Sequence, residues 1–230
     1  MKIAMEIPFN HLTDLSPYCD FDFALAHVVL KQGQGSKYVK FYKKQASKGR
    51  IIWVDNSAHE LKNSLPIPSL IKAAKLIDAT HIVAPEERGD HIETLKGVFQ
   101  LKDALDAGGL NDIFKIVGVW QGYQKSLEIL QIYCNEVALP FDRLRDKFLT
   151  KETCSNFHYF GFRTFDELKR FPPKSIDTSL PIRAVQYNID LLSRERRPRT
   201  PLLDFESKLS DRDLEKVVFY IKKMREASGN

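Results

Sequence analysis

The sequence predicts a (β/α)8 TIM barrel with a C-terminal helical extension. Eight short apolar stretches, each a candidate strand, mostly alternate with helix-like segments along 230 residues, and 43% of the chain is apolar. Alternation of this kind is typical of parallel β/α architecture, and eight units favour a closed barrel. We expect one domain, with the barrel core over residues 1–185 and the helical extension over residues 186–230. A doubly wound open sheet is the competing topology, but the chain lacks the GxGxxG and P-loop motifs of its commonest nucleotide-binding forms.

The first half of the chain supplies four of the expected strands. They are residues 3–7, 23–30, 51–54 and 81–84, each ended by a proline, glycine or polar turn. Between them we expect a helix over residues 37–47, stopped at Gly49, and another over 69–77 with Ser69 as its N-cap. Apolar residues at 70, 73, 74 and 77 recur at helical spacing and support the second helix.

The second half continues the pattern. Strands are expected at residues 113–119, 136–139 and 157–160 and in the stretch around Asp177. The helices of this half are expected at residues 91–107, 126–133, 142–149, 164–171, 184–193 and 211–226, with Thr164 and Ser210 as N-caps.

The net charge of +5 and the pI near 9 suit a polyanionic partner. The basic residues gather in two clusters, one interleaved with aromatic residues over 37–50 and one over 194–199. From these clusters we expect nucleic-acid contacts by Lys40, Lys43, Lys44, Arg194, Arg196, Arg197 and Arg199. A solvated surface is the alternative interpretation of each cluster.

The chain has no apolar run of the roughly 18 residues that a membrane span needs, and it begins without a signal-like segment. The three cysteines are far apart and form no metal-ligand spacing. We therefore expect a cytoplasmic protein with no membrane partner, no metal and no cofactor.

Candidate site residues stand at or just past the ends of several expected strands. They are Asp55, Glu86, Gln121, Gly161 and Asp177, and Arg183 follows shortly after the last of them. Because barrel enzymes place catalytic groups at the carboxyl ends of their strands, we expect these residues at one mouth. Each also has an alternative interpretation as a loop or capping residue. Two carboxylates in one site can divide the roles of nucleophile and general acid/base.

At these positions the sequence resembles the tRNA-guanine transglycosylase superfamily. The stretch Asp177-Thr178-Ser179-Leu180-Pro181-Ile182-Arg183 resembles its D-x-x-L-P-x-R, and Phe160-Gly161-Phe162-Arg163-Thr164-Phe165-Asp166-Glu167-Leu168 resembles its M-G-V-G-T-P-E-D-L. The family's G-I-V-Q-G is similar to Gly118-Val119-Trp120-Gln121-Gly122, and its D-S-G-G corresponds to Asp55-Asn56-Ser57-Ala58. Its guanine-binding Asp corresponds to Glu86. The matches follow the family's order over about residues 3 to 185.

The sequence also departs from that pattern. The family's zinc site has no counterpart, and the glycines of D-S-G-G are replaced by Ser57 and Ala58. The chain is short and looks most like the compact phage and bacterial relatives that insert 7-deazaguanine bases into DNA.

The resemblance implies a transglycosylase that exchanges guanine for a 7-deazaguanine derivative in DNA, with a free preQ-type base as co-substrate. Asp177 would be the nucleophile and Asp55 the general acid/base. Substrate contacts would come from Glu86, Gln121, Gly122, Gly161 and Arg183.

Three alternatives remain open. The chemistry could act on tRNA, the chain could be a non-catalytic nucleic-acid-binding barrel, or it could be an unrelated barrel enzyme with a small phosphorylated substrate. The inserted base, the sequence context and the oligomeric state are not predicted.

Overall fold

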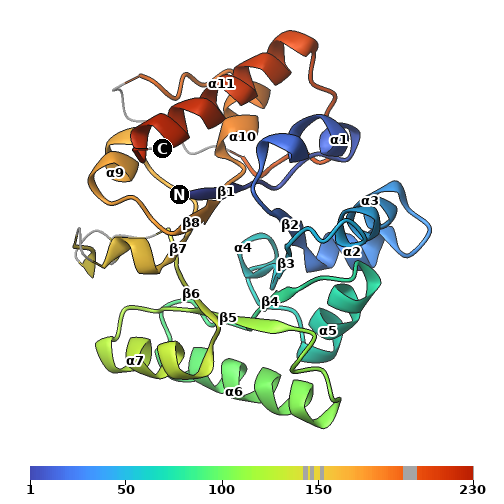
Figure 1. Ribbon diagram of the computed structural model, residues 1–230, viewed down its shortest axis with the longest axis vertical. Coiled ribbons are helices and arrows are strands. Elements are labelled where there is room, and N and C mark those ends of the chain that lie inside the picture. Colours follow the sequence, from blue (N-terminus) through green and yellow to red (C-terminus); the bar gives the residue numbers. More distant parts are fainter. Residues whose placement is uncertain (142–144, 146–147, 151–152, 194–200, 230) are drawn as a thin grey trace. The chain divides into compact units, whose positions relative to one another are not determined.

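The computed structural model contains eight strands that alternate with helices, which confirms the predicted (β/α)8 barrel class (Figure 1). It describes residues 1–141, 145, 148–150, 153–193 and 201–229. The strands are β1 (Lys2–Ala4), β2 (Asp22–Leu25), β3 (Ile52–Asp55), β4 (His81–Val83), β5 (Lys115–Val119), β6 (Glu136–Leu139), β7 (His158–Phe160) and β8 (Ser175–Asp177). In the part of the chain described, no helix has the length and apolar character needed to cross a membrane.

The chain forms two compact units. Residues 21–145 make one, here called the central unit, and residues 1–20 with 146–230 make the other, the terminal unit. In the central unit the strand order is β6-β5-β4-β3-β2, and in the terminal unit it is β1-β8-β7. The paired strands are parallel, with Val54 beside Ile82 and Phe160 beside Asp177. The predicted division at residue 185 stays a prediction.

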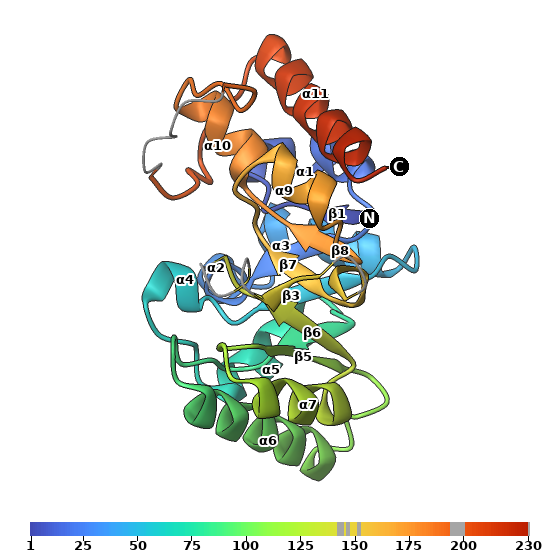
Figure 2. The same cartoon turned by 90° about the vertical axis from the view of Figure 1, so that its left-hand side faces the viewer.

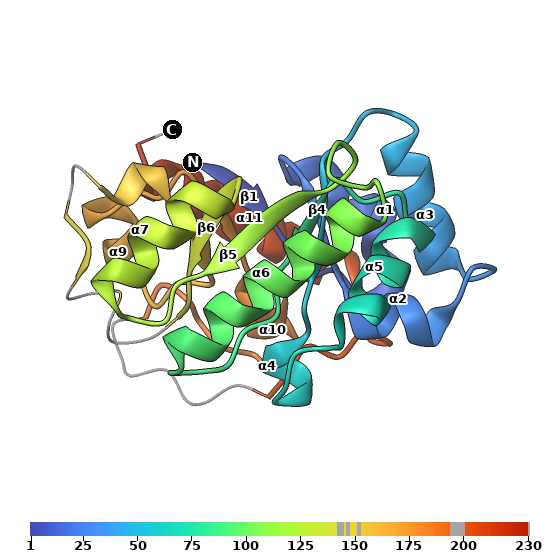
Figure 3. The same ribbon diagram turned by 90° about the horizontal axis from the view of Figure 1, so that it is seen from below.

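Helices cover the sheet of the central unit. They are α2 (Ala26–Gln32), α3 (Lys37–Ala46), α4 (Ala58–Leu61), α5 (Ile67–Leu76), α6 (His91–Ala107) and α7 (Gln124–Tyr133). Figure 3 shows α5, α6 and α7 beside one another, and α6 contacts both of its neighbours. Because both faces of the strands are covered, the strands are almost entirely buried and read as continuous apolar runs.

The terminal unit holds the helices α1 (Leu12–Leu15), α9 (Phe165–Arg170), α10 (Leu180–Gln186) and α11 (Asp211–Ala227), and short 3₁₀ turns at Phe9–His11, Ser16–Tyr18 and Cys154–Asn156. In this unit α11 packs against α9 and α10 (Figure 2). Ala184, Leu191 and Tyr220 form the buried centre of that contact. The C-terminal helical extension predicted from the sequence is therefore present.

Several helices begin where the sequence places a capping side chain. Ser36 accepts from the amide of Val39, and Thr164 accepts from the amide of Glu167. Ser210 and Asp213 form a reciprocal capping box at the start of α11. Such caps satisfy amide groups that have no partner inside the helix, which fixes where each helix starts.

Four predictions of strands and helices are corrected by the structure or lie partly outside the residues that it describes. The expected strand over 23–30 ends at Leu25, and residues 26–32 form α2, since a short apolar run does not distinguish a strand from a buried helix. Ser69 lies inside α5, because Pro66 and Pro68 start that helix earlier. The helix expected at 184–193 is wrong beyond residue 186, because α10 begins earlier, at Leu180 beside Pro181, and ends at Gln186. Most of the helix expected at 142–149 lies outside the described residues.

Gly97 in α6 sits directly against the loop that follows β4. A Cβ atom at this position would lie 2.6 Å from the carbonyl oxygen of Pro85, which is a backbone atom and cannot rotate away. Glycine therefore allows α6 to approach the residue that immediately precedes Glu86.

We predict that Gly97→Ala destabilises the protein by about 1–3 kcal/mol, because the added methyl group forces α6 and the loop apart. Without this close contact, alanine would stabilise the helix interior relative to glycine. A decrease in the free energy of unfolding of Gly97→Ala therefore indicates the close approach, and an increase argues against it. Chemical denaturation measures this change, with Gln100→Ala on the exposed side of α6 as control. A Gly97→Ala protein as stable as the native one would contradict the close approach.

Candidate functional site

Glu86 and Gln121 meet at the carboxyl ends of β4 and β5. The Gln121 Nε2 donates to Glu86 Oε2 at 2.6 Å, and the Gln121 Oε1 accepts from the Gly89 amide at 2.9 Å. The second bond fixes which end of the amide faces the carboxylate. The structure thus brings together two of the residues predicted to bind substrate.

The loop after β4 is held from its other side by Ser64. Its hydroxyl donates to the Glu86 carbonyl at 2.9 Å and accepts from the Glu86 amide at 2.8 Å. Because the amide and the carbonyl of Glu86 are both hydrogen-bonded, its backbone is held in place, and this limits where its carboxylate can lie.

The turn after β3 carries Asp55, Asn56 and Ser57. Asp55 is half-buried, and its Oδ2 accepts from the Ser57 amide at 2.7 Å. The buried Asn56 side chain donates to the Ala84 carbonyl at 2.7 Å, which ties the end of β3 to the end of β4. Ser57 has a left-handed φ of 63° in this turn. The expected general acid/base is therefore also its own turn's cap, as the alternative interpretation of Asp55 predicted.

Burial raises the pKa of the Glu86 carboxyl to about 7, even though hydrogen bonds from the Asn56 and Gln121 amides act in the opposite direction. Arg88 also favours the charged form, while Glu87 disfavours it. Near neutral pH this group is present in both protonation states, which is the property expected of a functional carboxylate.

The pH dependence of stability should report this pKa. Since the folded-state pKa lies above the unfolded value of 4.5, the Glu86 contribution is complete below pH 4.5 and is lost as pH rises to about 7. We predict that the native protein loses about 3 kcal/mol relative to Glu86→Gln across this window.

Urea unfolding at a series of pH values measures that difference. Glu87→Gln, the exposed neighbour, is the control and should follow the native protein. A constant offset between native and Glu86→Gln at all pH values would contradict the raised pKa.

Asp177, the predicted nucleophile, ends β8 in the terminal unit and is 5% exposed. Its Oδ1 lies 2.8 Å from Nε2 of His158, which is fully buried, and Nδ1 of the same ring lies 2.9 Å from the Ser175 hydroxyl. His158 pairs with Ser175 in the β7–β8 register, so its ring reaches Ser175 and, two residues on, Asp177 on the same face.

This chain of contacts fixes the roles of the ring atoms. An ionised Asp177 is an acceptor only, so Nε2 of His158 must carry a proton and donate it. When the ring is neutral, Nδ1 accepts from the Ser175 hydroxyl.

Nitrogen-15 NMR of the histidine rings tests that arrangement. We expect His158 to show a protonated Nε2 whose proton exchanges slowly with water, because the ring is buried and hydrogen-bonded at both nitrogens. Exposed His59 serves as the fast-exchanging control. A neutral ring protonated at Nδ1 would contradict the assignment.

The other residues predicted to bind substrate are two glycines with positive φ and one arginine in α10. Gly122 and Gly161 both have positive φ, of 96° and 69°, so their conformations explain the choice of glycine. The Gly161 amide donates to the Asp177 carbonyl at 2.8 Å, which joins Gly161 to β8, the strand that carries the predicted nucleophile. Arg183 is half-buried in α10, one turn after Ser179.

Of the predicted nucleic-acid contacts, Lys40, Lys43 and Lys44 lie exposed on α3. Arg194, Arg196, Arg197 and Arg199 lie outside the described residues.

The sequence prediction left out His158, Asn56 and Ser64. His158 is recognisable in retrospect, since an alternating Ser-Ile-Asp strand beside His-Tyr-Phe places His158, Ser175 and Asp177 on one face once the register is known. Asn56 directly follows a strand, and only its contact with Ala84 distinguishes it from an ordinary turn residue. Nothing in the sequence around Ser64 indicates its contact with Glu86.

Comparison with known proteins finds likeness in structure and not in sequence. No family model matches the chain, and no curated protein does. Among solved structures, tryptophan synthase from M. tuberculosis superposes with a TM-score of 0.55 at 7% identity, covering 98% of this chain and 91% of that one. That likeness is one of fold alone.

Two further solved structures superpose less closely. Dihydrodipicolinate synthase from Agrobacterium tumefaciens str. C58 has a TM-score of 0.49 at 11% identity, covering 98% of this chain and 97% of that one. N-acetylneuraminate lyase from Mycoplasma synoviae has a TM-score of 0.47 at 13% identity, covering 93% and 88%.

The predicted membership of the tRNA-guanine transglycosylase superfamily is therefore wrong. The fold superposes on tryptophan synthase with a TM-score of 0.55, and no family model supports the sequence motifs. Proline in the first turn of a helix and polar residues at the carboxyl ends of strands also occur in β/α barrels of other families, so these short motifs do not identify a family.

Proposed function

We propose that the protein is a transglycosylase that exchanges guanine for a 7-deazaguanine derivative in DNA through a covalent Asp177–sugar intermediate. The proposal rests on the side chains of the two units and on no family relationship. The observation that carries it is the Glu86–Gln121 pair.

This pair suits the hydrogen-bonding edge of a guanine-like ring. That edge presents two N–H donors beside a carbonyl acceptor. An ionised Glu86 can accept from both donors, and the Gln121 amide, whose orientation Gly89 fixes, has a second N–H to offer the carbonyl. A ring that lacks one of these groups leaves a partner unsatisfied, at a cost of about 1–3 kcal/mol.

The chemistry assigned to Asp177 is a nucleophilic substitution. Its carboxylate forms a bond to C1′ of the target nucleotide while the C1′–N9 bond breaks, and the bonding electron pair leaves with guanine. Asp55 is the acid that protonates the leaving base. The incoming 7-deazaguanine then attacks C1′ through the equivalent nitrogen, Asp55 takes that nitrogen's proton, and Asp177 is released.

The charge of the chain supports a polymer substrate. Lys40, Lys43 and Lys44 are exposed together on α3, where they can bind phosphates. A target base within a duplex must be flipped out or already single-stranded to react, so both forms of DNA belong in the assay.

Base exchange with labelled guanine is the direct test. We expect the native protein to incorporate label into DNA, and Asp177→Asn to lose at least about a thousandfold in rate, since the nucleophile is removed. Asp55→Asn should lose on the order of 10²–10⁴-fold. Glu86→Gln should mainly raise KM for the free base, by about tenfold to a hundredfold.

Parallel reactions with duplex DNA, single-stranded DNA and tRNA decide among the alternatives. Label entering only tRNA would favour a tRNA enzyme. Binding of DNA with no incorporation into any polymer would favour a binding module and contradict the nucleophile. An activity toward a small phosphorylated compound, with no affinity for nucleic acid, would favour an unrelated barrel enzyme.

A further inference from the structure

Positive charge is concentrated in two short segments of the central unit. Residues 26–50 and 61–77 together contain ten lysines and arginines and no aspartate or glutamate. Because the whole chain has a net charge of +5, all its other residues together have a net charge of −5. The basic pI is therefore produced locally, and the remainder of the chain is acidic.

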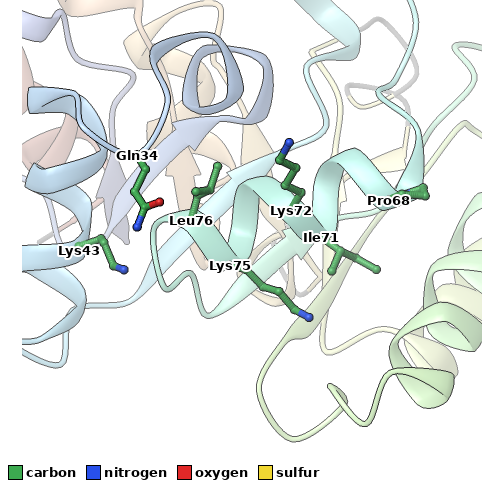
Figure 4. A pocket seen from close by; sticks show the side chains of 7 residues that line it. All are labelled: Gln34, Lys43, Pro68, Ile71, Lys72, Lys75 and Leu76. Carbon is green, nitrogen blue, oxygen red and sulfur yellow. The ribbon is translucent and has the colours of Figure 1, made fainter.

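The fold places these two segments side by side. They form α2, α3 and α5, and α2 packs against both of the other helices. A groove of about 410 Å³ lies at this surface, lined by Gln34, Lys43, Pro68, Ile71, Lys72, Lys75 and Leu76. Figure 4 shows Gln34 and Lys43 on one side of this lysine groove and the side chains of α5 on the other.

The groove's charged lining is entirely cationic. Lys43 approaches Asp78 at 3.6 Å, but both side chains are about half exposed, so water weakens the attraction. Arg50 is different, because it donates to the buried Asp22 at 2.9 Å and 3.2 Å and so serves the fold. Lys72 and Lys75 are exposed.

We propose that the lysine groove binds the phosphodiester backbone of a nucleic acid, with Lys72 and Lys75 of α5 extending the contact that Lys40, Lys43 and Lys44 make from α3. This inference rests on the proposed function. It names the surface that would bind the nucleic acid backbone at a distance from the base that reacts.

Both the shape and the chemistry of the surface favour a phosphodiester chain. The cations are spread along two neighbouring helices, which matches an extended polyanion better than a single phosphate. They are lysines, which act as flexible point charges, and no arginine lines the groove to form a bidentate contact with a base. Contacts of this kind position a nucleic acid without reading its sequence.

Fluorescence anisotropy with labelled duplex and single-stranded DNA at several salt concentrations tests the proposal. The variant is Lys72→Gln/Lys75→Gln, which removes two charges from exposed side chains. The control is Lys96→Gln/Lys102→Gln on α6 of the same unit, where each lysine has an acidic partner at i−3 or i+4. Both variants have the same net charge.

We expect the α5 variant to bind DNA at least about tenfold more weakly at low salt, and its slope of log K against log salt on duplex DNA to fall by about 1.8. The control should bind close to the native level. Equal binding by the native protein and the α5 variant, or an equal loss in the control, would overturn the proposal. So would binding to phosphatidylglycerol vesicles through Lys72 and Lys75 without binding to DNA.

The base-exchange assay separates this inference from the proposed function. Loss of DNA binding in the α5 variant, in a protein whose native form exchanges no base, would support the groove and contradict the transglycosylase. Native exchange that is unaffected in rate and KM for DNA by Lys72→Gln/Lys75→Gln would support the transglycosylase and contradict the groove.

Discussion

A partly buried carboxylate just after β4 is the constraint that organises the central unit. A carboxylate with little access to water needs donors around it. Glu86 receives them from Gln121, two residues after β5, and from Asn56, which directly follows β3. Each donor is held in turn, Gln121 by Gly89 and Asn56 by Ala84 and Ala58. Three neighbouring strand ends are thus tied together by amide groups, and the pKa of the central carboxyl remains close to neutrality.

In the terminal unit the carboxylate of Asp177 has a different kind of hydrogen-bond partner. Asp177 receives a ring N–H from His158 instead of side-chain amides, and that ring is itself fixed by Ser175. An imidazole can change its charge near neutral pH, whereas an amide cannot. The two units therefore hold their carboxylates in two ways, one with side-chain amides and one with a buried imidazole.

Local patterns in the sequence predicted the elements well and the side-chain contacts poorly. The strand over 136–139 and the helix over 91–107 were correct to the residue, because Pro140 ends the strand and Asp90 and Gly108 bound the helix. Residues 26–30 were wrong because a buried helix and a buried strand are both apolar. The positions of Glu86, Gln121 and Asp177 at or just past strand ends were predicted correctly, because strand ends follow from the local sequence pattern. His158 and Ser64 were missed because their contacts join residues 17 to 22 positions apart and depend on strand register and on the path of a loop.

The contact between Gly97 and Pro85 also has a consequence for motion. Because Gly97 has no side chain, α6 lies directly on the loop that carries Glu86. The hydroxyl of Thr94, on the same helix, accepts from the Glu87 amide and donates to the Glu87 carbonyl. Helix and loop therefore belong to one cooperative unit, since neither can open without breaking contacts of the other. Fraying of this outer helix would expose the Glu86 carboxylate further to water, so the protonation state of Glu86 is coupled to the local unfolding of α6.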